Sequence, residues 1–161
     1  MAKKKSDNKE LINYEYGEMD SLEELNAKAD ELKAAGDSEG VVRLAKENGI
    51  DEDLADMYIQ GMLPTLCPDL MTAAVGKLDV ELKELDSKNS EVGAGIAEYL
   101  KQKAMEDDDI ARAIRKKGKD LSELCESVWK EAEKRKKEGS RCVYIPPFEV
   151  FQMARAYYLE G

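Results

Sequence analysis

Carboxylates are the side chains that could do chemistry in this sequence, because it contains no histidine. Without an imidazole, Ser-His and Cys-His hydrolase sites, histidine acid–base catalysis and His-ligated zinc sites are excluded. Consecutive acidic residues from Glu106 to Asp109 could bind Mg²⁺ or Ca²⁺, which take oxygen ligands. The run lacks the spaced ligands and the turn glycine of an EF-hand loop. We therefore expect it to start a helix, where the helix dipole favours negative charge, and we expect no metal site and no cofactor.

The three cysteines, Cys67, Cys125 and Cys142, offer no alternative catalytic group. Their odd number and wide spacing suit reduced thiols better than a disulfide framework. No imidazole is present to activate a thiol, and Cys125 falls on the expected inner face of a helix, where cysteine acts as a small apolar residue. An enzyme would have to work with carboxylates and a divalent metal, so we expect a protein that is not an enzyme.

Basic residues cluster between positions 112 and 141 and form a candidate face for nucleic acid or an acidic partner. Binding of this kind neutralises phosphates and weakens steeply as the salt concentration rises. Interleaved Glu131, Glu133 and Glu138 dilute the cluster, so an ordinary solvated helix surface is the alternative. The candidates for the basic face are Arg112, Arg115, Lys116, Lys117, Lys134 and Lys137.

The whole chain has the opposite sign, with a formal net charge of -10. Residues 1–66 contain sixteen acidic and eight basic side chains, whereas residues 67–161 contain nineteen and seventeen. A globally acidic protein is repelled by free nucleic acid, but its acidic half can compete for a positively charged channel. The candidates for this acidic surface are Glu23, Glu24, Asp51, Glu52, Asp53 and Asp56.

Aromatic residues concentrate in residues 140–161, which hold both Phe residues and three of the seven Tyr. One interpretation is a core, because a terminal helix stays docked only if its apolar face has partners. The alternative is a partner-binding patch, because tyrosine combines apolar area with a polar hydroxyl and is enriched at interfaces. The candidates for such a patch are Tyr144, Phe148, Phe151 and Tyr158.

Helix signals place all of these groups in an all-α fold. Residues 1–20 are expected to be a flexible arm. Ser21 followed by Glu24 is a capping box, and Asp51 suits the cap of a later helix, so residues 21–63 are expected to form a small acidic three-helix module.

Residues 67–161 are expected to form a helical bundle joined to that module. Pro68 suits the first position of a helix, and Ser90 suits the cap of the next. Apolar residues in the first of these helices step by four and three and should face the core, since the seam is too short for a dimerising coiled coil. That seam consists of Met71, Val75, Leu78, Leu82 and Leu85.

The end of the chain should contain two further helices separated by an extended segment. Asp120 suits the cap of a helix that reaches Glu138. Pro146 disfavours helical backbone at Ile145, and Pro147 suits the first turn of a final helix. No stretch approaches the roughly 20 apolar residues that span a bilayer, and the beginning lacks the apolar region of a signal peptide, so we expect a cytoplasmic protein.

The C-terminal part resembles PcfK-like proteins, which are small proteins encoded on conjugative plasmids and related mobile elements of Gram-positive bacteria. The resemblance covers roughly residues 90–161. It depends on the helix Ile96 to Met105 with its acidic continuation, the helix Leu121 to Lys137, and the ending CVYIPPFEVFQMARAYYLE. That ending looks like the family's E-V-x-x-x-A-x-x-Y-Y core. Residues 21–63 look like a small helical module that accompanies such proteins. The family has no established catalytic residues, so the resemblance implies a non-enzymatic accessory protein.

Two functions are therefore expected. The first is an acidic binding protein of a mobile genetic element that docks on a nucleic-acid-handling protein. Its most concrete form is an anti-CRISPR inhibitor that acts as a nucleic-acid mimic on a Cas effector nuclease, whose guide and target lie in a positively charged channel. The alternative is a DNA-binding accessory protein of conjugative transfer, a relaxosome component that uses the basic face. No membrane partner is expected in either case.

Overall fold

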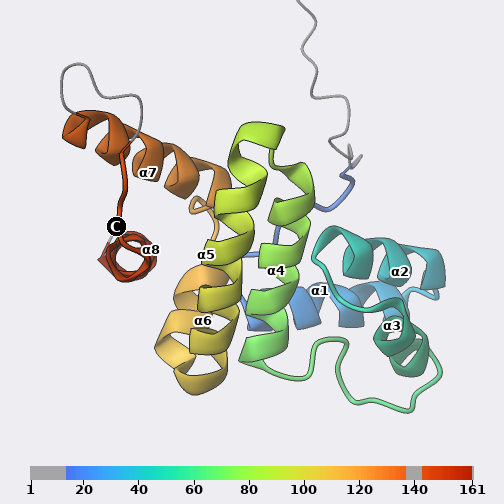
Figure 1. The fold of residues 1–161 in the computed structure, drawn as a ribbon. Coiled ribbons are helices and arrows are strands. Elements are labelled where there is room, and N and C mark those ends of the chain that lie inside the picture. Colours follow the sequence, from blue (N-terminus) through green and yellow to red (C-terminus); the bar gives the residue numbers. More distant parts are fainter. Residues whose placement is uncertain (1–13, 137–142, 161) are drawn as a thin grey trace, which may run out of the picture.

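The computed structural model describes residues 14–136 and 143–160, and over these ranges every regular element is an α-helix (Figure 1). The expectation of an all-α fold is confirmed. No helix within the described residues is both long enough and apolar enough to cross a membrane. Most of the expected arm, together with Lys137 and Cys142, lies outside the described residues. The helices are α1 (Leu22–Ala34), α2 (Ser38–Glu47), α3 (Glu52–Ile59), α4 (Leu70–Glu84), α5 (Ser87–Glu106), α6 (Asp108–Arg115), α7 (Leu121–Arg135) and α8 (Pro147–Glu160).

Side-chain caps start most of these helices. Ser21 Oγ accepts a hydrogen bond from the Glu24 N–H at 3.0 Å, and Glu24 Oε1 accepts one from the Asp20 N–H at 2.9 Å, so the predicted capping box is present in a slightly shifted form. Aspartate caps the six helices that follow, because its carboxylate accepts from otherwise unpaired N–H groups. These caps are Asp37, Asp51, Asp69, Asp86, Asp107 and Asp120.

Two of the predicted helix starts were wrong for the same reason. Asp69, and not Pro68, marks the start of α4, because the Asp69 carboxylate accepts from the Thr72 N–H at 2.8 Å. Asp86 caps α5, so the polar residues expected to form a turn before Ser90 are already helical. In both cases an aspartate near the expected start provides the cap, one residue after Pro68 and four residues before Ser90.

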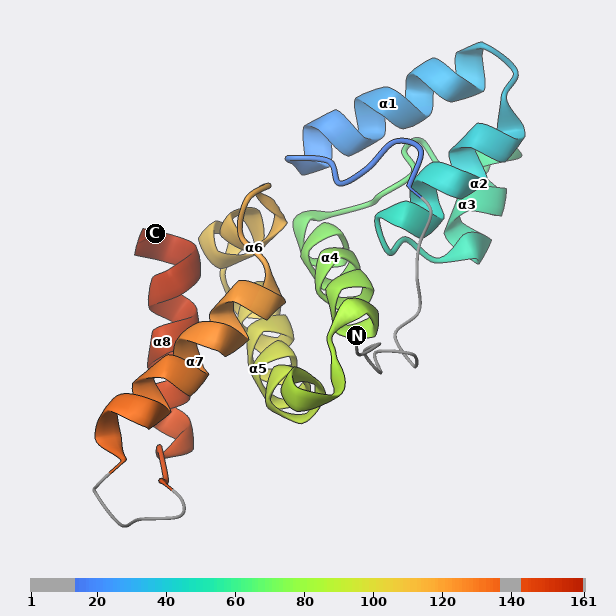
Figure 2. The same ribbon diagram turned by 90° about the horizontal axis from the view of Figure 1, so that it is seen from above.

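The buried apolar residues form two clusters, one on each side of α4 (Figure 2). The first contains residues of α1, α2 and α3, the segment that leads into α4, and Ala73. The second contains residues of α4 to α8, including Ala74 and Leu78. Adjacent residues of α4 therefore belong to different clusters, and α4 is the wall that both share.

The predicted core-facing seam of α4 is only partly buried. Leu78 and Leu85 are buried, and Leu82 packs against the second cluster. Met71 and Val75 are half-buried, belong to neither cluster, and line an open groove instead. Helical periodicity identified the apolar stripe, but it did not reveal that the stripe extends beyond the elements that cover it.

Candidate functional site

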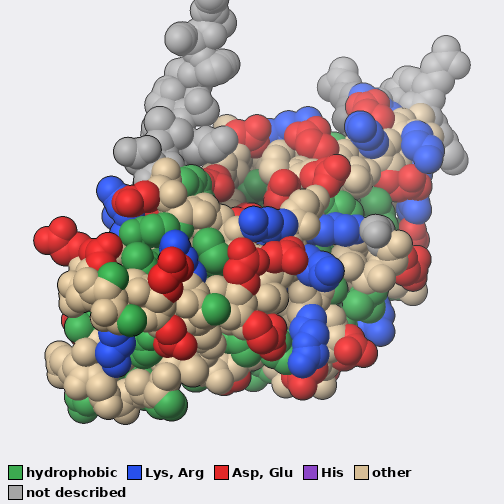
Figure 3. Space-filling view, turned by 180° about the vertical axis from the view of Figure 1, so that it is seen from behind, with side chains coloured by type: hydrophobic (Ala, Val, Ile, Leu, Met, Phe, Trp, Pro, Cys, Tyr) green, Lys and Arg blue, Asp and Glu red, His purple; other side chains and the backbone are tan. Residues whose placement is uncertain are grey.

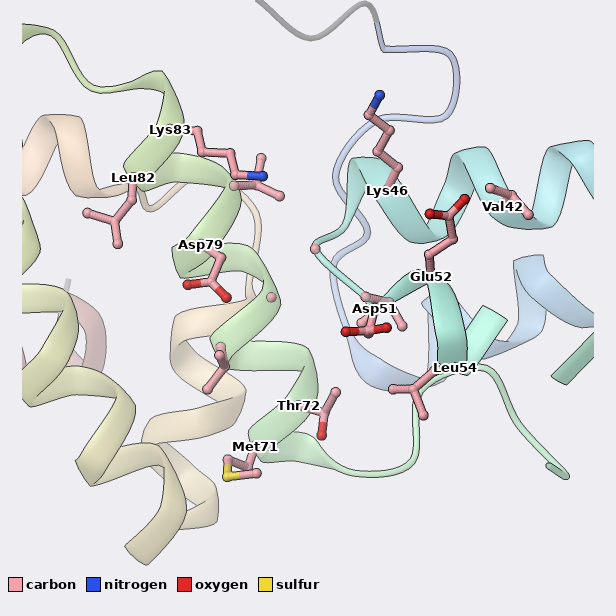
Figure 4. A pocket seen from close by; sticks show the side chains of 15 residues that line it. Val42, Lys46, Asp51, Glu52, Leu54, Met71, Thr72, Asp79, Leu82 and Lys83 are labelled. Carbon is pink, nitrogen blue, oxygen red and sulfur yellow. The ribbon is translucent and has the colours of Figure 1, made fainter. Parts of the chain in front are cut away.

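A groove of about 810 Å³ lies between α4 and the α2–α3 corner (Figure 4). One wall is formed by α4 and the other by α2, α3 and the turn between them. The apolar lining includes Val42, Ile50, Leu54, Met71, Val75, Val80 and Leu82, and the charged lining consists of Lys46, Asp51, Glu52, Asp79 and Lys83. The groove therefore combines an apolar interior with charged edges, which is the usual composition of a binding site.

Helix geometry explains the arrangement of the walls. Met71, Val75 and Asp79 are four residues apart, so they lie on one face of α4. Opposite them, Asp51 caps α3 by accepting from the Asp53 N–H at 2.8 Å, which places Glu52 in the first turn. Figure 4 shows the Asp51 and Glu52 side chains on the wall that faces α4.

The two walls meet at a contact between glycines. Gly49 has φ +73°, and a Cβ at this position would lie 2.0 Å from the Gly76 carbonyl oxygen. A Cβ on Gly76 would lie 2.5 Å from the Asn48 carbonyl oxygen. Only glycine at both positions allows the α2–α3 turn to approach the backbone of α4 this closely. This contact fixes the separation of the walls and therefore the shape of the groove.

A buried arginine holds the same elements together. Arg115, at the end of α6, is 2% exposed. Its Nε donates to the Met19 carbonyl at 3.0 Å, Nη1 to the Ala73 carbonyl at 3.0 Å, and Nη2 to Asn48 Oδ1 at 2.5 Å. One guanidinium thus joins α6, α4, the end of α2 and the segment before α1.

Polar side chains at the end of α2 hold the segment before α1. The buried Glu47 carboxylate accepts from the N–H groups of Glu15, Tyr16 and Gly17 at 2.6, 2.8 and 2.8 Å. The neighbouring Asn48 Oδ1 accepts from the Met19 N–H at 3.0 Å. Because Asn48 also accepts from Arg115, these bonds connect the segment before α1 to the guanidinium that joins α6 and α4.

A second buried polar group joins α4 to the helices on its other side. Lys77 is 2% exposed, and its Nζ donates to the carbonyl oxygens of Ile114 and Lys119 at 2.7 and 2.5 Å. Glu81 Oε1 accepts from the Leu121 N–H at 3.0 Å. Glu81 Oε2 lies 3.3 Å from Lys77 Nζ, an ion-pair distance without hydrogen-bond geometry. Burial raises the pKa of the Glu81 carboxyl to about 7, although Lys77 and the Leu121 N–H act in the opposite direction.

This buried carboxyl predicts a pH dependence of stability. Because its pKa is higher in the folded than in the unfolded chain, Glu81 contributes stability that is fully present below about pH 4.5 and is lost as the pH rises through about 7. Glu81→Gln keeps an acceptor for Leu121 and should flatten the decrease in unfolding free energy between pH 5 and pH 7.5. Urea denaturation at a series of pH values measures this slope. Glu98→Gln, on the exposed side of α5, is the control and should leave the slope of the wild type unchanged. If Glu81→Gln also leaves the slope unchanged, the prediction is wrong.

The six predicted acidic-surface residues are all exposed, and three of them line two different grooves. Asp51 and Glu52 line the groove described above. Glu23 lines a smaller groove of about 510 Å³ next to the starts of α4 and α6, and Met71 contributes to both. Within the described ranges, no ion pair involves any of the six, namely Glu23, Glu24, Asp51, Glu52, Asp53 and Asp56.

The predicted basic face was wrong at Arg115, which is buried because its guanidinium bonds to backbone and amide oxygens of other elements. Arg112, Lys116 and Lys117 are exposed around the end of α6. Lys134 is exposed near the end of α7, where it pairs with Glu131 at 3.5 Å. Figure 3 shows Lys and Arg side chains interspersed with Asp and Glu on the face that it presents.

The predicted aromatic patch divides into exposed and buried parts. Tyr144 is 75% exposed and Phe148 is 61% exposed, at the entry to α8. Phe151 is half-buried and stacks on Tyr99 of α5, with ring centroids 4.3 Å apart. Tyr158 is 4% exposed and belongs to the second cluster, so its assignment to a partner surface was wrong. The face of α8 that carries it packs against α5, α6 and α7, which is why the ring is covered.

The remaining candidates for chemistry have structural roles. In the acidic run, Asp107 caps α6 by accepting from the Asp109 N–H at 2.9 Å, as expected for a helix start. The described residues contain no group of three or more side chains that could hold a metal ion. Cys67 and Cys125 are buried, and burial raises the pKa of each thiol to about 11, which disfavours the reactive thiolate.

The sequence contains a local signal for the buried polar groups. Arg115 follows Ala111 by four positions, and Ala111 lies on the apolar face of α6. Lys77 and Glu81 follow Ala73 at the same spacing in α4. Charged side chains in register with an apolar face are candidates for burial.

No family model matches the chain, and neither does any curated protein or solved structure. The resemblance to PcfK-like proteins therefore depends on the sequence motifs alone.

Proposed function

We propose that this chain is a non-enzymatic acidic binding protein of a mobile genetic element, and that it docks on a nucleic-acid-handling protein. The observation that carries the proposal is the set of exposed acidic side chains in the first turn of α1 and around the start of α3, none of which forms an ion pair with another described residue. These residues are Glu23, Glu24, Asp51, Glu52, Asp53 and Asp56. Carboxylates without internal partners produce a negative field that attracts a cationic surface.

Several acidic side chains elsewhere pair with lysine or arginine. Glu131 pairs with Lys134 and Arg135, and Arg135 also pairs with Glu149 at 2.6 Å. Asp79 pairs with Lys101 at 2.7 Å. Residues 1–66 carry eight more acidic than basic side chains and residues 67–161 only two more, which supports a negative surface on α1 and α3. A nuclease that holds guide and target in a positively charged channel is a partner with matching charge, so inhibition of a Cas effector is the most specific form of the proposal.

The test is a cleavage assay with purified effector, guide RNA and target DNA at about 0.15 M salt, combined with a pull-down. The wild-type chain should be retained and should inhibit cleavage. Glu23→Lys with Asp56→Lys should weaken inhibition by about tenfold, whereas Glu91→Lys with Glu98→Lys on α5 changes the net charge equally and should have a smaller effect.

Two outcomes would contradict the proposal. If no effector retains the chain and cleavage continues unchanged, the inhibitor form is wrong. If the chain instead binds DNA with an affinity that falls steeply with salt, the function is that of a DNA-binding accessory protein. In that alternative the basic face would not include Arg115, because its side chain is buried.

A further inference from the structure

The groove between α4 and the α2–α3 corner contains apolar surface that the fold leaves uncovered. Met71 and Val75 are half-buried, four residues apart on α4, and belong to neither hydrophobic cluster. Across the groove, Val42 and Leu54 are also only partly buried. An apolar stripe that faces apolar side chains across an open groove is the arrangement that accepts an amphipathic helix.

The dimensions of the groove fit such an occupant. Its lining on α4 extends from Met71 to Lys83. At 1.5 Å per residue this is about 18 Å, or roughly three turns of a bound helix. The Gly49–Gly76 contact fixes the floor, and Arg115 bonds the elements that meet there, so the walls are held apart before any partner binds. A preformed groove loses less conformational entropy on binding than one that must open.

The acidic start of α3 favours basic side chains on the part of an occupant that lies beside it. Asp51 and Glu52 lie on the α3 wall, and no ion pair among the described residues neutralises them. Residues 50–60 contain no basic residue, so the α3 part of this wall is acidic, whereas Lys46 of α2 and Lys83 of α4 also line the groove. A second copy of the chain is disfavoured, because each copy has a net charge of -10.

We propose that this groove docks an amphipathic helix of the partner, with apolar side chains against Met71 and Val75 and with Lys or Arg beside Asp51 and Glu52. The inference rests on the proposed function and adds to it the surface and the chemistry of the docked element. Apolar contact supplies the affinity, and the acidic start of α3 favours a helix with a basic side chain at that position.

The probe is a fluorescent 18-residue Leu/Lys peptide with its leucines on one helical face, and its binding to the full chain is measured by anisotropy at about 0.15 M salt. A scrambled peptide of the same composition controls for simple charge attraction. The amphipathic peptide should bind at least tenfold more tightly than the scrambled one, because only it presents a continuous apolar face. Equal binding of the two peptides, or none, would overturn the proposal.

Matched variants locate the contact. Met71→Ala with Val75→Ala should weaken binding by about tenfold, and Tyr144→Ala with Phe148→Ala should leave it within about twofold. Glu52→Gln should weaken it about threefold, whereas Asp53→Asn, one residue further and outside the groove lining, should have less effect. Thermal unfolding checks that each variant is folded.

The outcomes separate this inference from the proposed function. If the aromatic pair weakens binding and the groove pair does not, the partner docks at the entry to α8 and the groove proposal is wrong. If sedimentation shows a dimer that Val75→Ala dissociates, the occupant is a second copy, and the proposal is also wrong. In either case, inhibition of a purified effector by the wild-type chain would leave the proposed function standing.

Discussion

Arg115→Ala is expected to lower the free energy of unfolding by about 3–5 kcal/mol, the largest effect of any single substitution that we predict. The substitution removes a fully buried side chain and its hydrogen bonds to the Met19 and Ala73 carbonyls and to Asn48 Oδ1, which keeps only the Met19 N–H. The loss exceeds that of an ordinary hydrogen bond, because each abandoned acceptor remains away from water. Urea denaturation followed by circular dichroism measures it.

Two further variants distinguish the buried contacts from general effects of charge. Arg112→Ala, on the exposed side of the same helix, should change stability by less than about 0.5 kcal/mol. Arg115→Lys should restore only part of the loss, because an ammonium lacks the planar fork that reaches separate acceptors. A loss below about 1 kcal/mol for Arg115→Ala, or full recovery with lysine, would show that the guanidinium does not hold these elements together.

Gly76→Ala is expected to lower the free energy of unfolding by about 2 kcal/mol, even though alanine is the better helix former. The added Cβ would lie 2.5 Å from the Asn48 carbonyl oxygen, which is too close for either backbone to remain in place. Gly95→Ala on α5 is the matched control, because a Cβ there meets nothing within 4 Å. That control should gain about 0.5–1 kcal/mol.

Gly49→Ala tests the same contact from its other side. It should lose more than Gly76→Ala, since its positive φ adds roughly 1 kcal/mol of backbone strain to the clash. If Gly76→Ala stabilises the chain as much as Gly95→Ala does, the two walls of the groove are not in contact at this point.

The sequence predicted the elements better than their contacts. Short-range signals, such as the capping box at Ser21 and the cap at Asp51, placed the first and third helices, because capping involves residues two to four positions apart. The burial of Arg115 depends on acceptors 42 to 96 positions away in the sequence, which no local pattern contains. A cation at a helix end looks the same locally whether it is solvated or buried.

The same limit applies to the candidate site. Periodicity marked Met71 and Val75 as apolar stripe residues, but whether a stripe is covered depends on the positions of other elements. The positive φ of Gly49 favours glycine after the end of α2, and the approach of Gly49 to Gly76 adds a second requirement for glycine. The groove results from these long-range contacts, so it could not be predicted from the sequence.

The bonds of Arg115 also have a consequence for the order in which the chain folds during synthesis. The guanidinium reaches Met19 across 96 positions of sequence and Asn48 across 67. Because the ribosome releases the chain from its N-terminus, the first three helices emerge long before the residue that completes their packing. The Arg115 contacts form only after α6 has emerged, so in early intermediates the packing of the acidic N-terminal half is incomplete. A long-range polar contact of this kind raises contact order and slows folding relative to a simple up-and-down bundle.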